Sequence, residues 1–444
     1  MRKNSDRRNF LRQASMGSAA LLVAGQAPLL AFNGSPNEKV VLAVMGTNGR
    51  GEYLATLFAG IPGVEIGYIC EVDETVMNRT LGVIEKKTGK RPPGFKDIRK
   101  LLEQKDIDAL VVAAPDHWHA PATLLAVQAG KHVYVEKPCS HNPAEGELLV
   151  KAASVHNRLI QMGNQRRSFP GVMKAMQDLR DGAIGRPYFA KGWYTNNRKS
   201  IGRGKETAVP ANLDFDLWQG PAPRRAYKDN LVHYNWHWFW HWGTGEALNN
   251  GTHELDVMRW GLDVSFPSKV VSAGGRYQWK DDWETPDTQT ISYEFNNNTA
   301  ILWEGRSCND YRIEGSGRGV IFYGEKGTLV IPGGDDYRIH DESGKMIREE
   351  KSKVGKIEAT TIGMGETLDQ LHLINFINSI RGQEKLHSPI AEGHVSTLLP
   401  QLGNIAWRTG NTLHCDPVNG HILNDKKAMA LWNREYEKGW APKL

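Results

Sequence analysis

Hydrophobic runs separated by amphipathic stretches dominate the first part of the chain after residue 38. The apolar runs cover residues 39–45, 64–70, 107–114 and 131–135. Continuous runs of this kind are typical of strands buried on both faces of a parallel sheet. Amphipathic stretches at 52–59 and 120–129 lie between them. Strands that alternate with helices predict βαβ units and a doubly wound α/β domain.

The second half has a different pattern. Short strand-like segments, separated by Gly, Asn and Asp turns, lie at 270–273, 288–295, 299–306, 319–323 and 328–331. Apolar residues recur at helical spacing over 368–380 and 394–409. This grouping predicts an α+β domain, and more than 400 residues after the N-terminal segment are too many for one ordinary core.

The first 31 residues have the pattern of an export signal. Arg7 and Arg8 are followed by Phe10-Leu11 and by a small-residue apolar run over 14–24. This pattern predicts a twin-arginine signal peptide, cleaved near Ala31, that carries a folded protein to the periplasm or outside the cell through the twin-arginine machinery. A Sec signal or an N-terminal anchor that happens to contain two arginines is the alternative.

Removing that segment changes the meaning of the charge. The chain has 55 basic and 50 acidic residues, of which five basic and one acidic lie in residues 1–31. The remainder is nearly neutral, so nucleic acid is not an expected partner. No later run approaches the roughly 18 apolar residues of a membrane span, so none is expected in the mature form. The four cysteines lack C-x-x-C spacing, which argues against a zinc site and leaves four thiols or a single disulfide open.

The first strand runs into a glycine-rich turn. This turn and the start of its helix contain Gly46, Asn48, Gly49, Arg50 and Gly51. Glycines there let a pyrophosphate approach the backbone and the helix N-terminus. Glu71 lies 20 residues after Gly51, at the end of the second strand, where a carboxylate accepts ribose hydroxyls and repels a 2′-phosphate. The pattern predicts a site for NAD rather than NADP; a plain glycine turn and an ordinary strand-end carboxylate are the alternatives.

Six motifs along the chain resemble those of one enzyme family. They lie at residues 113–119 (AAPDHWH), 129–138 (AGKHVYVEKP), 163–167 (GNQRR), 217–222 (LWQGPA), 251–256 (GTHELD) and 403–406 (GNIA). Together they resemble the oxidoreductases named after glucose–fructose oxidoreductase and inositol dehydrogenase (Gfo/Idh/MocA). The A-G-K-x-V-x-x-E-K-P string is specific, and the resemblance spans nearly the whole mature chain.

The resemblance implies a domain organisation. An NAD-binding Rossmann domain would cover 38–160, and an α+β domain with a large, mostly antiparallel open sheet would cover 161–415 for substrate binding and oligomerisation. Residues 416–444, with three large aromatic side chains, would form an ordered wrap. The exposed face of such a sheet predicts a homodimer or homotetramer.

The resemblance also assigns the proton-transfer chemistry. It makes Lys137 the first candidate, with a following Pro138 bond that is often cis in the family; a surface lysine is the alternative. Burial and a nearby nicotinamide would lower the pKa of Lys137. His253 is the second candidate, or else a core histidine. The family commonly places an aspartate four residues earlier, but this chain has Asn249, so the usual pair is incomplete. Asp256 could fix the tautomer of His253 or be a helix-surface carboxylate.

Further cofactor contacts follow from the same motifs. They are Pro115, Asp116, His119, Glu136, Lys137, Gln165 and Arg166. Asp116 replaces the asparagine of the family pattern, and Arg166 could instead be a structural, salt-bridged arginine.

An unusual aromatic segment at residues 233–242 (HYNWHWFWHW) allows two interpretations. Tyr234, His237 and Trp238 could stack on and hydrogen-bond a sugar. The tryptophans could equally belong to a strand buried against another domain or subunit. A zinc site is disfavoured because no carboxylate is interleaved, so no metal is expected.

Three functions remain open. The first is an exported NAD-dependent oxidoreductase of a sugar, polyol or glycoside hydroxyl with a tightly held cofactor. The second is an NAD-retaining glycoside hydrolase that works by transient ring oxidation and elimination. The third is a non-catalytic dinucleotide- and sugar-binding protein.

Overall fold

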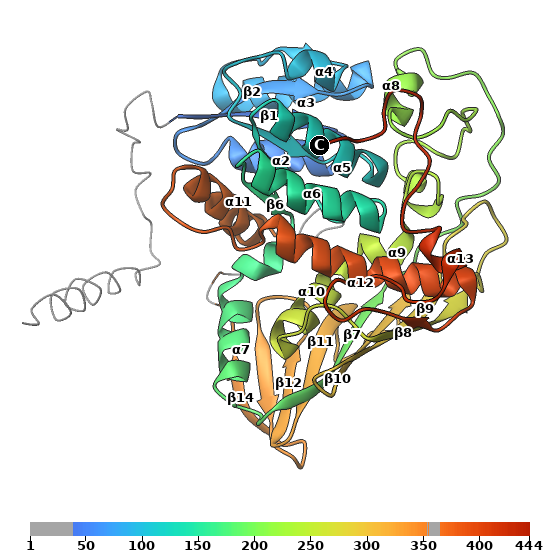
Figure 1. Cartoon of the computed structure of the whole chain (residues 1–444). Coiled ribbons are helices and arrows are strands. Elements are labelled where there is room, and N and C mark those ends of the chain that lie inside the picture. The colour runs from blue at the N-terminus through green and yellow to red at the C-terminus, as the bar shows by residue number, and fades with distance from the viewer. Residues whose placement is uncertain (1–38, 353, 355–364) are drawn as a thin grey trace, which may run out of the picture.

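The computed structural model describes residues 39–352, 354 and 365–444 of the chain. The predicted export signal at 1–31 lies outside these residues. Figure 1 shows a smaller, helix-covered sheet above a broad open sheet, with helices between the two.

The N-terminal part is a six-stranded parallel sheet. Its strands are β1 (Val40–Met45), β2 (Val64–Cys70), β3 (Gly94–Phe95), β4 (Ala109–Val112), β5 (His132–Val135) and β6 (Ile160–Met162). Its helices are α2 (Arg50–Phe58), α3 (Glu74–Thr88), α4 (Ile98–Leu101), α5 (Asp116–Gln128) and α6 (Pro143–Val155). The strand order is β3-β2-β1-β4-β5-β6, so the order reverses between β1 and β4. Ligands of such sheets bind at the carboxyl ends of the strands beside this reversal.

The second part is built on a nine-stranded mixed sheet. Its strands, in spatial order, are β14 (Met346–Glu350), β13 (Tyr337–His340), β12 (Gly327–Ile331), β11 (Arg318–Gly324), β7 (Pro187–Thr195), β10 (Thr299–Arg306), β9 (Thr288–Phe295), β8 (Lys269–Gly275) and β15 (Leu413–His414). Every neighbouring pair is antiparallel except β7 with β10. The predicted fold class, a Rossmann domain followed by an α+β domain with a mostly antiparallel sheet, is therefore confirmed.

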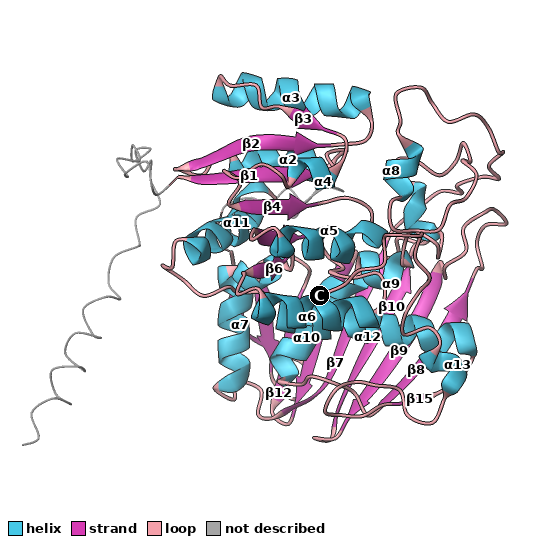
Figure 2. Ribbon diagram, turned by 45° about the horizontal axis from the view of Figure 1, so that its top comes forward, coloured by secondary structure: helices cyan, strands magenta, loops and turns pink. Residues whose placement is uncertain are grey.

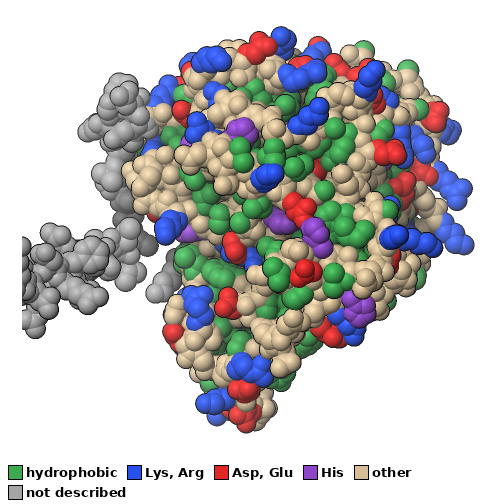
Figure 3. Space-filling model, viewed as in Figure 1, with side chains coloured by type: hydrophobic (Ala, Val, Ile, Leu, Met, Phe, Trp, Pro, Cys, Tyr) green, Lys and Arg blue, Asp and Glu red, His purple; other side chains and the backbone are tan. Residues whose placement is uncertain are grey.

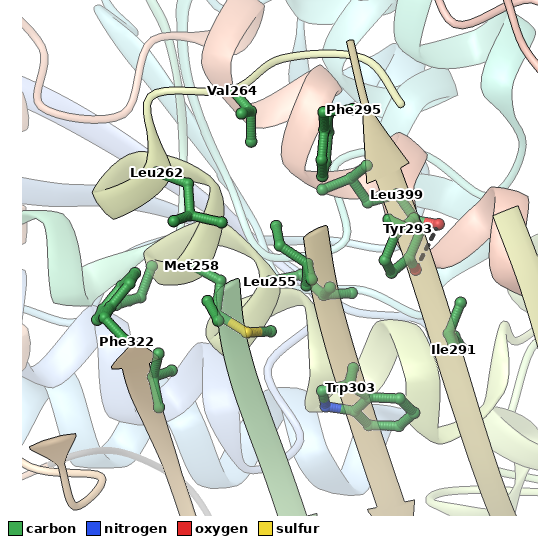
Figure 4. Packing of buried hydrophobic residues seen from close by; sticks show 14 of the residues in the cluster. Leu255, Met258, Leu262, Val264, Ile291, Tyr293, Phe295, Trp303, Phe322 and Leu399 are labelled. Atoms are coloured by element: carbon green, nitrogen blue, oxygen red, sulfur yellow. Dashed lines mark hydrogen bonds between the residues drawn. The ribbon is translucent and has the colours of Figure 1, made fainter. Parts of the chain in front are cut away.

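Helices cover one face of this sheet. The remaining helical elements are η2 (Gln165–Ser168), α7 (Pro170–Arg180), α8 (Phe215–Gln219), η3 (Asn235–Trp238), α9 (Gly245–Asn249), α10 (Gly251–Leu262), α11 (Glu366–Ile380), α12 (Ile390–Thr409) and α13 (Lys426–Met429). Strand β10 alternates buried and half-buried residues, as expected for a sheet with one covered face. Its Trp303 packs in one core with Leu255 and Met258 of α10 (Figure 4). Tyr293 of β9 lies in the same core and donates a hydrogen bond to the carbonyl of Leu399 in α12.

Helix α11 departs from the predicted domain limits. It lies in the range 161–415, yet Leu373, Phe376 and Ile377 pack into the core of the Rossmann sheet. The apolar periodicity of this helix predicted its existence correctly but carried no information about which sheet it covers. The two domains therefore share this element, which brings Asp369 to the first domain.

The last residues lie across the Rossmann domain. Arg434 pairs with the buried Glu145 of α6 at 2.8 Å. The ring of Trp440 packs edge-on against Trp118 of α5, with centroids 5.2 Å apart. Figure 2 places the C-terminus over the helices that cover this sheet.

Three further observations concern the surface charges, the helices and the cysteines. Lys, Arg, Asp and Glu side chains are interspersed on the face drawn in Figure 3. Among the described residues, no helix has the length and apolar character needed to cross a membrane. All four cysteines, Cys70, Cys139, Cys308 and Cys415, are free thiols.

A buried ion pair ties the start of the second part to its core. Arg167 of η2 donates to both oxygens of Asp256 in α10 at 2.8–3.0 Å, and Ser396 of α12 donates to the same carboxylate at 2.6 Å. Burial opposes ionisation of Asp256, but the Arg167 guanidinium outweighs it and lowers the pKa of this carboxyl. The pair therefore contributes at neutral pH, and its contribution is lost only as the pH falls below the ordinary range of aspartate.

We expect Asp256→Asn to lower the free energy of unfolding by about 3 kcal/mol, because it leaves a buried guanidinium without its main counter-charge. Urea denaturation followed by tryptophan fluorescence measures the change. The control is Glu103→Gln, which breaks the exposed Lys100–Glu103 pair and should leave the midpoint unmoved. Equal midpoints for the Asp256 variant and the unmodified protein would show that this pair does not stabilise the fold.

Candidate active site

A cavity of about 790 Å³ lies between the carboxyl edge of the parallel sheet and the second part. Most of the predicted site residues line it. These are Gly46, Asn48, Gly49, Arg50, Glu71, Pro115, Asp116, His119, Glu136, Lys137, Gln165, Tyr234, His237, Asn249 and His253. Four predicted residues are not among the lining residues: Gly51, Arg166, Trp238 and Asp256.

The glycine turn has the shape that a dinucleotide needs. A Cβ built on Gly46 would lie 2.5 Å from the backbone of Ala114, and one on Gly51 would lie 1.8 Å from the carbonyl oxygen of Gly46. Gly51 therefore packs directly against the backbone of the turn, where a side chain would not fit. Gly49 has a φ of 77° and faces open space. No side chain caps the start of α2, so backbone N–H groups there remain available to a pyrophosphate.

Glu71 holds the other side of this turn. One of its oxygens accepts from the backbone N–H of Thr47 at 2.7 Å, and the other accepts from the N–H of Val72 at 2.8 Å. The N–H of Asp73 also donates to the oxygen bound by Val72, at 3.1 Å, whereas the oxygen bound by Thr47 has only one further, long contact, from the Thr47 hydroxyl at 3.4 Å. That second oxygen can therefore accept a ribose hydroxyl, while the negative charge repels a phosphate there. These residues fit an NAD molecule.

Arg50 is neutralised from two sides. Its Nε donates to Glu136 at 2.9 Å, and its Nη1 donates to Asp369 of α11 at 3.3 Å. Gln165 also donates to Glu136, at 3.1 Å, and to the hydroxyl of Tyr134 at 3.0 Å. Arg50 is thus a paired cation in the cavity wall.

Lys137 spans the two parts of the molecule. It follows β5, and its peptide bond to Pro138 is cis. Its Nζ donates to the backbone carbonyl of Asn249 at 2.6 Å and to the side-chain Oδ1 of Asn249 at 3.1 Å. Burial lowers the pKa of Lys137 from that of a free lysine, so the neutral amine is more accessible than on a surface side chain.

His253 lies in the first turn of α10, four residues after Asn249, which ends α9. It is 8% exposed and lines the cavity. Burial, together with the positive charges of Arg318 and Lys137, lowers its pKa well below the ordinary value. His253 is therefore a neutral imidazole at physiological pH.

Asp116 and His119 lie at the start of α5. Thr244 donates a hydrogen bond to Asp116 at 2.5 Å, and burial raises the pKa of this carboxyl. The two ring nitrogens of His119 lie 2.5 Å from the carbonyl oxygen of Pro138 and 2.7 Å from that of Ala114. The ring is therefore anchored by the backbone that carries Lys137.

The aromatic segment is not a strand. Residues 235–238 form the 3₁₀ helix η3, so the interpretation of this segment as a buried strand is wrong. Tyr234 and His237 line the cavity, as predicted, and Trp236 and His233, which were not predicted site residues, line it too. Burial lowers the pKa of His237 to about 3. Trp238 is fully buried and stacks on Trp283, with centroids 3.9 Å apart, so its predicted contact with substrate is also wrong.

Two further predictions need correction. Asp256 is neither the partner of His253 nor a helix-surface carboxylate, because it is buried in the ion pair with Arg167. Arg166 is also buried; it lies 3.4 Å from Glu254 and donates to the carbonyl of Gly333 at 2.7 Å. The structural alternative for Arg166 is therefore the correct one. Arg166 and Gln165 are adjacent in one motif, and this adjacency did not reveal that only the side chain of Gln165 lines the cavity.

Several cavity residues were missed. They are Tyr194, Asn196, Arg198, Arg318 and Asp369. Tyr194 lies in β7, Asn196 and Arg198 follow this strand, and Arg318 begins β11. Their place at the ends of strands is the feature of the sequence that could have indicated them. Arg198 donates to Glu246 at 2.6 Å and to the hydroxyl of Tyr234 at 2.8 Å. Among the residues that the structure describes, no three His, Cys, Asp or Glu side chains form a group that could hold a metal ion.

Comparison with known proteins gives relatives of two kinds. A glycosyl hydrolase family 109 protein of Saccharopolyspora erythraea is 29% identical over 252 residues, which are 50% of this chain and 55% of that protein. An inositol 2-dehydrogenase of Rubrobacter xylanophilus is 28% identical over 298 residues, 67% of this chain and 72% of that protein. The chain spans about half the length of the first of these curated relatives.

Solved structures share the fold. Levoglucosan dehydrogenase, in complex with NADH and levoglucosan, superposes with a TM-score of 0.66 at 16% identity, covering 85% of this chain and 99% of that one. An oxidoreductase of Agrobacterium radiobacter in complex with NAD⁺, L-tartaric acid and magnesium has a TM-score of 0.63 at 14% identity, covering 85% and 98%.

Family models match both parts of the chain. Residues 41–164 match the oxidoreductase family with the NAD-binding Rossmann fold, and residues 193–332 and 317–442 match the C-terminal alpha/beta domain of the same family. The glycine turn, Glu71 and the uncapped start of α2 are the features such a domain uses to hold its nucleotide. The protein therefore belongs to the Gfo/Idh/MocA family of NAD-binding oxidoreductases.

Proposed function

We propose that the protein oxidises a CH–OH group of a carbohydrate and keeps its NAD tightly bound. The observation that carries the proposal is one cavity with two chemically distinct walls. The glycine turn and Glu71 form the nucleotide wall, and Lys137, His253 and Tyr234 line the same cavity. NAD, when bound, supplies the hydride acceptor.

Lys137 is the proton acceptor in this proposal. Its lowered pKa makes the neutral amine available, and the two oxygens of Asn249 hold Nζ in one place. The amide of Asn249 cannot take a proton at neutral pH. The neutral ring of His253 hydrogen-bonds the reacting hydroxyl, and Asp256 plays no part because it is paired elsewhere.

Aromatic and hydroxyl groups support a carbohydrate substrate. Tyr234 is half exposed at the cavity, and its ring lies 4.7 Å from that of His237. Rings of this kind cover the apolar faces of sugars, while their polar atoms bond hydroxyls. An inositol dehydrogenase among the relatives and a levoglucosan dehydrogenase of the same fold agree with this substrate class.

A second candidate is glycoside hydrolysis with no net redox change. It is favoured by the family 109 glycosyl hydrolases among the curated relatives, which are 28–31% identical over parts of the chain. Oxidation of a ring carbon would acidify the neighbouring C–H, and elimination would then release the aglycone. Addition of water and return of the hydride from the reduced nucleotide would give the free sugar and restore NAD. The same Lys137 would serve the oxidation in both candidates.

Incubation of the purified protein with sugars, polyols and glycosides, without added cofactor, tests the proposal. We expect the reduced-nicotinamide absorbance to rise and an oxidised carbohydrate to form, in an amount that matches the nucleotide released on denaturation. Free sugar without lasting reduction would instead establish the hydrolase. No reaction across a broad panel would leave only a binding role and overturn the proposal.

We expect Lys137→Met to lower kcat about 10²–10⁴-fold, the usual contribution of a positioned general base. In the unmodified enzyme, kcat should fall as the pH drops through the lowered pKa of Lys137, since protonation removes the acceptor. The matched control is Lys131→Met, because Lys131 is also buried but donates to the carbonyl of Ile107. Equal loss of activity in both variants, with nucleotide still bound, would contradict the assignment.

We further propose that Arg7 and Arg8 direct export of the folded chain with its nucleotide in place. Replacing both by lysine should leave the unprocessed protein in the cytoplasm of a bacterial host, as cell fractionation would show. Arg2→Lys is the control and should not change the distribution. Normal export of the double variant would rule out the twin-arginine route.

A further inference from the structure

Glu246 is a buried carboxylate just behind the cavity wall. It lies on the short helix α9 and is 3% exposed. Four side chains donate to it: Arg198 at 2.6 Å, Ser307 at 3.0 Å, Asn249 at 3.2 Å and Asn250 at 2.5 Å. Three of these donors, Arg198, Asn249 and Asn250, also line the cavity. Glu246 therefore joins two parts of the wall without touching the cavity itself.

The contact with Asn249 decides how the amide faces Lys137. A carboxylate can only accept, so the amide nitrogen of Asn249 must point to Glu246. The amide oxygen is then left to accept from Nζ of Lys137, at 3.1 Å, beside the backbone carbonyl of Asn249 at 2.6 Å. If the amide turned over, its NH₂ group would face the ammonium, and Lys137 would lose one of its two acceptors.

The contact with Arg198 orders the other part of the wall. The guanidinium is mostly buried and is neutralised by Glu246. Its Nη1 donates to the hydroxyl of Tyr234 at 2.8 Å, and it lies 4.9 Å above the ring of Trp238. A buried arginine without its carboxylate would be costly, so the place of the Tyr234 ring depends on the same carboxylate that orients Asn249.

We propose that Glu246 is a positioning residue that holds Lys137, through Asn249, and Tyr234, through Arg198, in a fixed mutual arrangement. This inference rests on the proposed function of the cavity. Glu246 does not contact substrate or nucleotide in this scheme. It acts through the two side chains that it orients.

Glu246→Gln tests the proposal because it keeps the shape and removes the charge. We expect kcat to fall about ten- to hundredfold, as for small misplacements of reacting groups, with a raised KM. With one acceptor lost and Arg198 no longer neutralised, the ammonium of Lys137 is destabilised. The pKa of Lys137 should therefore fall further, and the acid limb of the kcat profile should move down by about one pH unit.

The matched control is Glu145→Gln. Glu145 is equally buried and pairs with Arg434, but its carboxylate contacts His141, just before α6, and the C-terminal segment. A purely structural role for Glu246 would give similar losses of stability in both variants and no movement of the acid limb in either. That result would overturn the proposal.

Asn249→Ala provides a second test that leaves the pair of Glu246 and Arg198 intact. We expect it to move the acid limb in the same direction. In the double variant, the loss of kcat should be smaller than the product of the single losses, because the second change removes a contact that is already broken. Multiplicative losses would show that Glu246 does not act through Asn249.

Competitive acetylation of Lys137, followed by mass spectrometry on the NAD-loaded protein without substrate, separates the two proposals. The pH dependence of labelling should shift down in Glu246→Gln and stay unchanged in Glu145→Gln. If the unmodified protein turns over no carbohydrate but the labelling shift occurs, the proposed function fails and the positioning role stands. If turnover is normal and labelling does not shift, the positioning role fails.

Discussion

The contact between the ammonium of Lys137 and the two oxygens of Asn249 is the interaction on which the site depends. A buried ammonium is costly unless its protons are bonded, and here both acceptors come from one residue of the other part of the molecule. The contact therefore closes the cavity across the domain boundary and also sets the proton affinity of Lys137. Two neutral oxygens hold the ammonium less strongly than a carboxylate would, so burial keeps the pKa of Lys137 below its usual value.

Two part-buried arginines that line the cavity, Arg50 and Arg198, each have a carboxylate partner from a distant part of the chain. Arg50 pairs with Glu136 and Asp369, and Arg198 pairs with Glu246. Such pairs add little net stability but are costly to break, so they act mainly to keep a particular arrangement. The wall facing the nucleotide is thus electrically balanced, which suits the neutral, hydroxyl-rich substrate that we propose.

Membership of an NAD-binding oxidoreductase family narrows the chemistry without naming the substrate. The curated relatives include an inositol dehydrogenase and glycosyl hydrolases, and both proposed reactions begin with removal of a hydride from a carbon and of a proton from the hydroxyl group on that carbon. The replacement of a carboxylate by Asn249 affects the proton and not the hydride. The features that distinguish this protein therefore lie in the few side chains around Lys137, because its nucleotide-binding end resembles that of other Rossmann domains.

Local sequence determined the features whose physics is local. The glycine turn, Glu71 and Lys137 each depend on a strand end and its neighbours, and the parallel sheet followed from continuous apolar runs. What the sequence could not reveal was which distant side chain each group meets. Gln165, Arg166 and Arg167 are consecutive in one motif, but only Gln165 faces the cavity. The two arginines are buried and form ion pairs in the core. Asp256 pairs with Arg167, and Trp238 stacks on Trp283. Only the folded chain decided these partners, because a buried charge or ring takes whichever complementary group the packing of sheets and helices brings within a few ångströms, whatever its distance along the chain.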